Sequence, residues 1–268
     1  MGTPSTMQPL LEVKQLTMDF GGLRALDHLD IDIQKGEIVA LIGPNGAGKT
    51  TFFNCITGLY NPTKGDIMIS PPGKKTERIN GLKPNHVTER GMARTFQNIR
   101  LFQNMSVLEN VMIGRHCRIH AGIAGAIFRN PATVAEEKQA VEDSYRVLEK
   151  IGLEQYVNEM AKNLPYGAQR RLEIARAMGT DPFLLLLDEP AAGMNPHETR
   201  ELVDLIIKVS KEENISILLI EHDMKLVMSL SDRIFVMDYG KKIAQGTPEE
   251  IKNNPVVIKA YLGEEIDA

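Results

Sequence analysis

The chain has 268 residues and a mass of 29.8 kDa, which allows one large domain or two small ones. Its composition of 43% apolar and 25% charged residues is typical of a globular protein and excludes the disordered, collagen-like and disulfide-scaffold classes. The 31 basic and 35 acidic residues give a net charge of −4, without the basic excess of a dedicated nucleic-acid binder. We therefore expect no nucleic-acid partner.

Cysteine spacing and hydropathy exclude further classes. The two cysteines, Cys55 and Cys117, form no C-x-x-C pair, so neither a zinc ribbon nor a disulfide framework is indicated. The longest strongly apolar run is Phe183–Leu187, far shorter than the roughly 18–20 residues that a membrane-crossing helix needs. We expect neither a transmembrane helix nor a secretory signal.

The first part of the chain predicts strands around a glycine-rich turn. Apolar and polar residues alternate at Leu29, Ile31 and Ile33, which indicates a half-buried strand, and Glu37–Ile42 is a fully apolar strand. The elements expected next are a helix over Thr50–Leu59, a strand over Ile67–Ile69, a short helix over Asn85–Gly91 and a brief strand at Thr95–Phe96.

The middle of the chain, from Ser106 to Met178, has helical character. A heptad-like spacing of apolar residues predicts an amphipathic helix with a stripe at Val134, Val141, Tyr145 and Leu148. Leu172–Met178 is expected to form another helix. We interpret this region as a helical insert.

The last third returns to strands alternating with helices. Phe183–Leu187 and Ser216–Ile220 are apolar strands, and the helix between them carries a stripe at Leu202, Leu205, Ile206 and Val209. Strands without polar alternation are typical of a parallel sheet that is covered on both faces.

The C-terminal region predicts a hairpin followed by a helix. Ile234–Met237 and Lys241–Ala244 flank the dipeptide Tyr239–Gly240 like the two arms of a hairpin. Thr247 then offers an N-cap, with a proline at the first helical position and a glutamate at the third. A short helix should begin there.

The glycine-rich turn carries the strongest chemical motif. Gly43–Thr50 fits G-x-x-x-x-G-K-[ST] and lies between a predicted strand and a predicted helix, the context that a phosphate-binding loop requires. Its backbone N–H groups can surround a triphosphate, Lys49 can reach the terminal phosphates, and Thr50 can bind magnesium. The alternative is an ordinary turn with a surface lysine.

A second motif ends the strand Phe183–Leu187. Asp188 and Glu189 follow it directly, at the strand end where parallel sheets hold their ligands. Two acids there can divide two tasks, so we assign Asp188 to the magnesium shell and Glu189 to polarising the attacking water. The alternative is a solvated acidic turn.

Three further positions complete the pattern. Gln97 and His222 each follow a short strand and should share the same sheet edge. The segment Leu164–Arg171 precedes a helix and offers a second N-terminus able to receive an anion. One nucleotide cannot easily use two such cradles in one chain, so the second cradle is expected to serve a nucleotide held by another subunit.

Together these motifs resemble the ATP-binding subunits of ABC transporters. The order is Walker A (Gly43–Thr50), a glutamine loop at Gln97, a signature segment (Leu164–Gln169), Walker B (Phe183–Glu189), a D-loop (Ala192–Asn195) and a switch histidine, His222. The segments Arg94–Phe102, Arg170–Arg176, the insert at Gly122–Arg129 and the ending Asn253–Gly263 are similar to the LivG type, which serves branched-chain amino-acid importers.

The resemblance implies an α/β fold with a P-loop NTPase (RecA-like) core, a parallel sheet, an N-terminal antiparallel β part and an inserted helical subdomain. It implies a single domain over 9–268. The core would span about 9–97 and 181–245, the helical subdomain about 98–180 and a C-terminal helical tail about 246–268.

The same resemblance implies roles for individual residues. Catalysis would fall to Glu189 as general base and to His222, which would hold the γ-phosphate. ATP would be bound by Phe20, which stacks on adenine, and by the loop residues Asn45, Gly46, Ala47, Gly48, Lys49, Thr50 and Thr51. Mg²⁺ would be held by Thr50, Gln97 and Asp188. The opposite nucleotide would meet Pro165, Tyr166, Gly167, Ala168 and Asn195.

The implied partners are a second ABC ATPase subunit, with a heterodimer favoured over a homodimer, and two transmembrane permeases. The apolar residues of Asn98–Glu109 would line the groove where a permease helix docks, or they belong to the core. An extracytoplasmic amino-acid-binding protein would act indirectly. The implied location is the cytoplasmic face of the inner membrane, as a peripheral subunit.

The signature segment departs from the family pattern. Pro165 stands where many relatives have serine, Tyr166 where glycine is usual and Ala168 where glutamine is usual, while Asn195 replaces the usual D-loop aspartate. We hypothesise that this signature grips the opposite nucleotide weakly.

Four alternatives remain. The ATPases of urea import and of lipopolysaccharide export are close relatives, but the insert and the C-terminal ending favour the amino-acid importer. A soluble ABC ATPase of translation or DNA repair usually carries two cassettes or a long coiled coil. A P-loop kinase would not explain the signature or His222.

Overall fold

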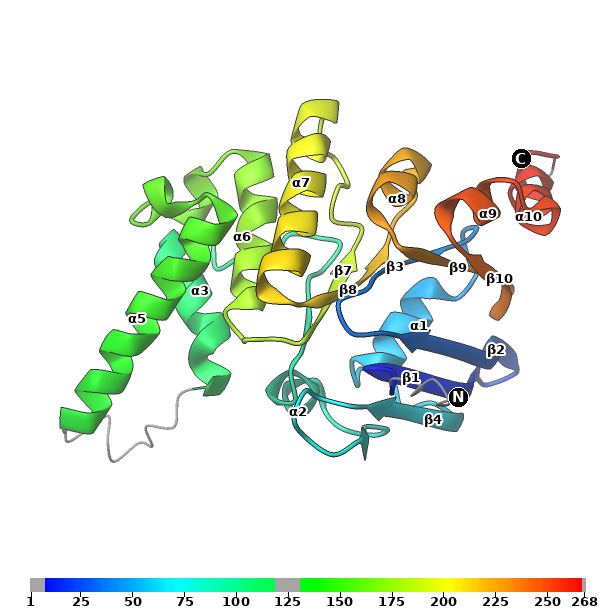
Figure 1. The fold of residues 1–268 in the computed structure, drawn as a ribbon, viewed down its shortest axis with the longest axis horizontal. Coiled ribbons are helices and arrows are strands. Elements are labelled where there is room, and N and C mark those ends of the chain that lie inside the picture. Colours follow the sequence, from blue (N-terminus) through cyan, green and yellow to red (C-terminus); the bar gives the residue numbers. More distant parts are fainter. Residues whose placement is uncertain (1–7, 119–130, 267–268) are drawn as a thin grey trace, which may run out of the picture.

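The computed structural model describes residues 8–118 and 131–266. Figure 1 shows a central region of strands, a group of helices at one end formed by α3, α5 and α6, and the short helices α9 and α10 at the other end. Within the two described ranges, no helix is both long enough and apolar enough to cross a membrane. The insert predicted at Gly122–Arg129 lies outside the described residues.

The strands form two sheets. The larger sheet has the order β10-β9-β3-β8-β7-β6, and all neighbouring pairs are parallel except β9 with β10. The smaller sheet has the order β2-β1-β4-β5 and is antiparallel. The strands are β1 (Leu11–Phe20), β2 (Leu23–Ile33), β3 (Ile38–Ile42), β4 (Lys64–Ile69), β5 (Glu77–Arg78), β6 (Met92–Arg94), β7 (Leu184–Asp188), β8 (Ser216–Ile220), β9 (Arg233–Asp238) and β10 (Lys241–Gly246).

Helices cover both faces of the larger sheet. They are α1 (Lys49–Ile56), α2 (Pro84–Glu89), α3 (Val107–Arg115), α5 (Pro131–Ile151), α6 (Tyr166–Met178), α7 (Pro196–Glu213), α8 (Met224–Leu230), α9 (Pro248–Lys252) and α10 (Pro255–Ile266), with 3₁₀ turns η1 (His116–Arg118), η2 (Glu154–Tyr156) and η3 (Ala161–Asn163). The predicted fold class, with parallel core, antiparallel part and helical insert, is confirmed.

The central strands separate two hydrophobic cores. Successive residues of β3 alternate between them: Ala40 packs into the core under α6, α7 and α8, whereas Leu41 packs into the core under α1 and the antiparallel sheet. Every residue of β3, β7 and β8 is buried, which explains their unbroken apolar sequences. Phe52 and Phe53 of α1 are fully buried, each worth about 1.5–3 kcal/mol, and they fix the helix that follows the phosphate loop.

The helical end consists of α3, α5 and α6, which contact one another. The predicted stripe on α5 is largely wrong. Leu148 is fully buried, but Val134, Val141 and Tyr145 are each more than one-third exposed. The buried face instead contains Thr133, Ala140, Ser144, Leu148 and Ile151. Short side chains occupy that face because α3 and α6 pack closely against it, and hydropathy alone does not register small or hydroxyl residues as core.

Several predicted boundaries also shift. The brief strand lies at Met92–Arg94 rather than at Thr95–Phe96, and α1 ends at Ile56, before Gly58. The helix predicted to begin at Leu172 begins at Tyr166. The N-cap of α9 is Thr247, as predicted, and its hydroxyl accepts the backbone N–H of Glu250 in a capping box.

Candidate nucleotide-binding site

The loop between β3 and α1 depends on two glycines. Gly43 and Gly48 have φ angles of 151° and 99°, in the region that favours glycine. A Cβ on Gly43 would lie 2.1 Å from the backbone oxygen of Met237, and one on Gly48 would lie 2.7 Å from that of Ala25. Both glycines therefore lie so close to neighbouring backbone that a side chain at either position would displace the loop.

Lys49 is buried at the first position of α1. Its Nζ donates hydrogen bonds to the backbone oxygens of Gly43 and Pro44, at 2.6 and 2.8 Å. These bonds hold the ammonium group inside the curve of the loop, where the backbone N–H groups and the N-terminus of α1 also favour an anion.

Glu189 is the meeting point of three motifs. It follows β7 with a φ of 48°, a left-handed turn that separates its direction from that of Asp188. Its Oε1 lies 2.8 Å from Nε2 of His222, and its Oε2 accepts a hydrogen bond of 2.7 Å from Nε2 of Gln97. The prediction that Gln97 and His222 share an edge with the acidic pair is confirmed by these contacts.

These side chains line one pocket, which we call the nucleotide pocket. It has a volume of about 540 Å³, within the usual range for ligand sites. It is lined by Phe20, Leu23, Arg24, Ala25, the loop residues Asn45–Thr51, Gln97, Glu189, His222, Tyr239 and Gly240. All the predicted nucleotide-binding residues therefore line the same pocket as Gln97 and the predicted catalytic pair.

Phe20 lies at the rim of this pocket. Phe20 is 42% exposed, at the end of β1, and its ring meets that of Tyr60 edge-on with ring centroids 5.3 Å apart. Phe20 is therefore not a core residue. An exposed aromatic face beside a phosphate loop is suited to stacking a base.

Basic charge at the rim is held in place by acidic neighbours. Arg24 donates from Nε to Asp19 at 2.9 Å and from Nη1 to Asp27 at 3.1 Å. Hydrogen bonds from His28 and Lys241, together with Arg24, lower the pKa of Asp27 to about 2. The carboxylate therefore stays ionised and keeps the guanidinium of Arg24 oriented at the pocket. Sequence patterns did not single out Arg24.

Asp188 is buried and paired, which the sequence analysis missed. Its Oδ2 accepts a 2.7 Å hydrogen bond from Nη2 of Arg94, and both side chains are about nine-tenths buried. The available signal was a lone charged residue in the apolar run Met92–Phe96, because a buried charge requires a partner.

Glu221 is also a buried acid. The sequence patterns gave it no role. It directly precedes His222, and its oxygens accept the backbone N–H groups of Ala191 and His222 at 2.9 and 3.1 Å. Burial raises the pKa of this carboxyl above its ordinary value. Glu221 thus connects the segment after Walker B with the switch histidine.

The signature residues lie away from the nucleotide pocket. In the described part of the chain, no residue of α6 lines it. Instead, the Tyr166 hydroxyl donates to the backbone oxygen of Ala192 at 2.7 Å and accepts from Nε of Arg170 at 3.1 Å. Gly167 and Ala168 are buried, whereas Pro165 and Tyr166 are exposed. The signature therefore packs against the D-loop of its own chain.

Asn195 has a structural role in this packing. Its Oδ1 accepts the backbone N–H groups of His197 and Glu198 at 2.9 and 3.0 Å, which makes it the N-cap of α7. The Asn195 backbone N–H in turn donates a hydrogen bond of 3.0 Å to Oε2 of Glu198. This capping box explains why asparagine serves in place of aspartate at this position.

The segment Asn98–Glu109 is divided between core and surface. Leu101 and Val107 are buried, whereas Phe102 and Met105 are more than one-third exposed. Phe102 lines a second pocket, of about 750 Å³, together with Arg94, Phe96, Arg100 and Arg176. We call this pocket the docking groove.

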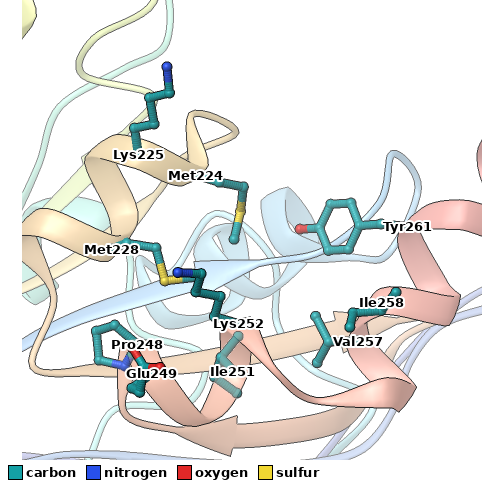
Figure 2. Close-up of a pocket in the computed structure, with 10 residues that line it drawn as sticks. All are labelled: Met224, Lys225, Met228, Pro248, Glu249, Ile251, Lys252, Val257, Ile258 and Tyr261. Atoms are coloured by element: carbon teal, nitrogen blue, oxygen red, sulfur yellow. The ribbon is translucent and has the colours of Figure 1, made fainter.

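A third concavity lies on the far side of the switch histidine. Figure 2 shows an apolar groove between α8, which begins two residues after His222, and the C-terminal helices α9 and α10. It is lined by the apolar residues Met224, Met228, Ile251, Val257 and Tyr261 and by the charged residues Lys225, Glu249 and Lys252. It has no residue in common with the nucleotide pocket.

Of the three predicted magnesium ligands, Thr50 and Gln97 line the nucleotide pocket, whereas Asp188, the residue before Glu189, does not. The donor atoms of all three suit the ion. A hydroxyl (Thr50), an amide oxygen (Gln97) and a carboxylate (Asp188) are the hard oxygen donors that Mg²⁺ prefers, usually with water and substrate phosphates completing the shell. In the part of the chain that the structure describes, no cluster of three or more His, Cys, Asp or Glu side chains offers a metal site of another type.

Comparisons with known proteins agree with this geometry. Residues 26–192 match the family model described as ABC transporter, and residues 241–267 match the model described as Branched-chain amino acid ATP-binding cassette transporter. The high-affinity branched-chain amino acid transport ATP-binding protein LivG of Salmonella typhimurium is 50% identical over 257 residues, 96% of this chain and 99% of its own. The corresponding BraF protein of Pseudomonas aeruginosa is 49% identical with the same coverage.

Solved structures are similar over the same extent. The ADP conformation of an ATP-binding cassette of an ABC transporter has a TM-score of 0.82 at 30% identity, covering 96% of this chain and 100% of that one. The chain belongs to the ATP-binding cassette family of ABC transporters, nucleotide-binding ATPases that work with transmembrane permeases. Within that family it belongs to the branched-chain amino acid group, whose C-terminal model it matches.

Proposed function

We propose that this chain hydrolyses Mg-ATP to drive the import of branched-chain amino acids. The observation that carries the proposal is the contact of Gln97, Glu189 and His222 at the mouth of the phosphate loop. Two independent sequence segments meet on Glu189, which is the arrangement that a water-activating carboxylate requires. The C-terminal match over residues 241–267 favours branched-chain cargo over urea or lipopolysaccharide.

The residues divide the chemistry among them. Lys49 and the loop N–H groups would bind the β- and γ-phosphates, and Phe20 would stack on adenine. Thr50, Gln97 and Asp188 would hold magnesium, which neutralises charge on the transferred phosphoryl group. Glu189 would accept the proton of the attacking water, while His222 would orient that water and bind the γ-phosphate.

Gln97 and His222 both hold the Glu189 carboxylate. The Gln97 amide donates to one carboxylate oxygen and His222 contacts the other. Binding of nucleotide would exchange these contacts for contacts to phosphate and water. Gln97 thereby links the state of Glu189 to the segment that begins at Asn98.

A permease helix would dock in the docking groove. That groove is lined by aromatic rings capped by guanidinium groups: Arg100 lies 4.5 Å from the Phe96 ring centroid and Arg176 lies 5.9 Å from that of Phe102. Exposed Phe102 and Met105 offer apolar contact area. Because Phe96 lines the groove and directly precedes Gln97 in the chain, displacement of that wall would change the contact between Gln97 and Glu189.

A second ATPase subunit would complete the site. The phosphate loop and the signature of one chain occupy different surfaces, so the signature is placed to meet a nucleotide held by another subunit. We propose a heterodimer, because Pro165 and Tyr166 leave this signature without the usual serine and glycine. The complex would lie on the cytoplasmic face of the inner membrane, with an extracytoplasmic binding protein delivering the amino acid to the permeases.

Purification from membranes and reconstitution test this proposal. The chain should co-purify with two permeases and a paired ATPase, which mass spectrometry would identify. In proteoliposomes with the cognate binding protein, ATP should drive uptake of labelled leucine, isoleucine or valine but not of urea. The matched control is the same complex carrying Glu189→Gln. Uptake of urea alone, or copurification with lipopolysaccharide-export proteins, would overturn the cargo assignment.

A further inference from the structure

Arg94 makes contacts with three elements of the site. It ends β6, three residues before Gln97. Its Nη2 donates to Asp188 Oδ2 at 2.7 Å, at the end of β7, and its Nη1 donates to Asn54 Oδ1 at 2.8 Å, on α1. A weaker contact joins Nη1 to Thr57 Oγ1 at 3.3 Å, just after α1. One guanidinium thus connects the Walker A helix, the Walker B strand and the strand that leads to Gln97.

Aromatic rings restrict the orientation of this guanidinium. The centroids of Phe53 and Phe96 lie 5.6 and 5.5 Å from its central carbon, within the range of cation–π interaction. Phe53 is fully buried, which fixes one of the two rings. The planar fork of Arg94 is therefore held in one geometry toward Asp188.

The contacts of Arg94 do not indicate a side chain that serves stability alone. A buried ion pair is often no more stabilising than well-packed apolar residues of similar volume. Among the described residues, Arg94 Nε is one of two buried side-chain nitrogen or oxygen atoms without a hydrogen-bond partner. An unsatisfied buried donor is unfavourable and calls for an explanation.

We propose that Arg94 is a positioning residue for the magnesium site: it holds Asp188 by one carboxylate oxygen and orients the other toward the metal shell. This inference rests on the proposed function, in which Asp188 belongs to that shell. Groups that orient the ligands of a metal typically change metal affinity 10- to 100-fold when they are altered. Arg94 would act in this way through Asp188, without touching the nucleotide itself.

The test is Arg94→Lys with Arg100→Lys as the matched control. Lysine keeps the charge but cannot donate to Asp188 and Asn54 simultaneously in the fixed geometry of a fork. Arg100 also lies over the Phe96 ring and lines the docking groove, but its backbone N–H, not its guanidinium, holds an acid, Glu173. The two substitutions therefore change the same chemistry with and without the link to Asp188.

The measurement is Mn²⁺ affinity in the ADP complex of the full chain, by electron paramagnetic resonance, with ADP affinity in EDTA measured in parallel. We expect Arg94→Lys to weaken Mn²⁺ binding at least tenfold, on the order reported for outer-shell partners, with ADP affinity in EDTA unchanged. Arg100→Lys should leave both unchanged. Wild-type Mn²⁺ affinity in Arg94→Lys, or equal losses with and without metal, would overturn the inference.

Two further variants keep the test decisive. Asn54→Ala removes only the anchor on α1 and keeps the ion pair, so it should fold even if Arg94→Lys does not, and it should weaken Mn²⁺ binding by a smaller factor. Wild-type affinity in that variant would count against the proposal. Asp188→Asn distinguishes failure of the proposed function from failure of this inference. If it leaves Mn²⁺ affinity intact, the assignment of Asp188 to the magnesium site fails. If it weakens Mn²⁺ binding while the Arg94 variants do not, only the role of Arg94 fails.

Discussion

The chain presents two helix N-termini of opposite character. The N-terminus of α1 follows a glycine-rich loop, contains the buried Lys49 and opens into a pocket of about 540 Å³. The N-terminus of α6 begins after Pro165, which supplies no side-chain cap, and Tyr166 there packs onto the chain's own D-loop. Both ends carry the same dipole, but only the first is surrounded by groups that converge on one point.

The difference teaches that the fold builds one nearly complete pocket and one exposed surface. The α1 end is fixed by two buried phenylalanines and by β3, whereas the α6 end belongs to the helical end of the molecule (Figure 1). An anion bound at α1 would meet Lys49, Gln97 and His222, which line the same pocket of this chain. An anion at α6 would need the remaining groups from another subunit.

The largest effect is expected at Glu189, in the pocket at the N-terminus of α1, which is the first of the two regions compared. Glu189→Gln should reduce ATP turnover about 10²- to 10⁴-fold, the usual contribution of a positioned general base, while ATP binding remains intact. Glutamine has nearly the same shape as glutamate but cannot accept the proton. Turnover is measured by phosphate release and binding by calorimetry.

Glu212→Gln, an exposed acid on α7, is the matched control and should behave as wild type. Wild-type turnover in Glu189→Gln would refute the general-base assignment. The pocket at α1 would then no longer differ from the surface at α6 by containing the general base.

The rim of the pocket should give the next largest effect. Phe20→Ala should weaken ATP binding by about 1–3 kcal/mol, the value of stacking one base on an aromatic ring. The reason is that Phe20 is an exposed aromatic residue that lines the pocket, where its ring can stack on the adenine. Fluorescence titration with ATP and with tripolyphosphate checks this.

Tripolyphosphate has no base, so its affinity should be unchanged in Phe20→Ala, and Phe20→Trp should retain ATP affinity. Equal losses for both ligands would mean that Phe20 supports the loop rather than the base. In that case the first region would be a phosphate site with an unassigned base contact.

Sequence patterns identified most of this first region because its residues are constrained locally. The motif Gly43–Thr50 specifies backbone shape, and a parallel sheet brings the residues after its strands to one edge. Gln97, Glu189 and His222 could therefore be brought together without a structure. The pairing of Asp188 with Arg94 could not, because it depends on how two strands and α1 pack around one buried guanidinium.

The helical end was predicted less well, because contacts between helices rather than local sequence decide which of its residues are buried. On α5 the buried positions include Thr133, Ala140 and Ser144 beside Leu148 and Ile151, and a hydropathy stripe does not indicate the first three. The start of α6 at Tyr166 was missed because proline and glycine next to it are typical of loops, although proline at an N-cap is compatible with a helix beginning directly after it. Contacts between helices, rather than local pattern, decide these features.

The second region, the N-terminus of α6, can be tested by substituting Pro165. Pro165→Ser supplies the hydroxyl and N–H that many family signatures have, and should tighten ATP-dependent dimer formation by about 1 kcal/mol, a charge-assisted hydrogen bond less the rigidity of the lost proline. Sedimentation with the paired subunit, ATP and Glu189→Gln checks the affinity.

Pro165→Ala is the control, because it restores the N–H without the hydroxyl. It separates the hydroxyl from the release of the proline ring. Equal dimer affinity and ATPase rate in wild type and Pro165→Ser would refute the hypothesis that this signature grips the opposite nucleotide weakly.

The smallest expected effect concerns the connection between the two regions. Glu221 accepts N–H groups from Ala191, next to the D-loop, and from His222, in the pocket. Because burial raises its folded-state pKa above the ordinary 4.5, the folded chain binds more protons than the unfolded chain between these two pKa values. The free energy of unfolding should therefore fall as pH rises through that interval, by about 1.4 kcal/mol per unit of pKa difference.

Glu221→Gln lacks this titration, so the stability of the wild type relative to the variant should decline as pH rises from about 4.5. Urea unfolding of both proteins over a series of pH values measures the difference. Glutamine presents one oxygen and one N–H₂ group to two backbone donors, so one of the two connections is lost at every pH. A constant difference between the proteins across the series would mean that Glu221 stays ionised in the fold, held by its N–H donors against the effect of burial.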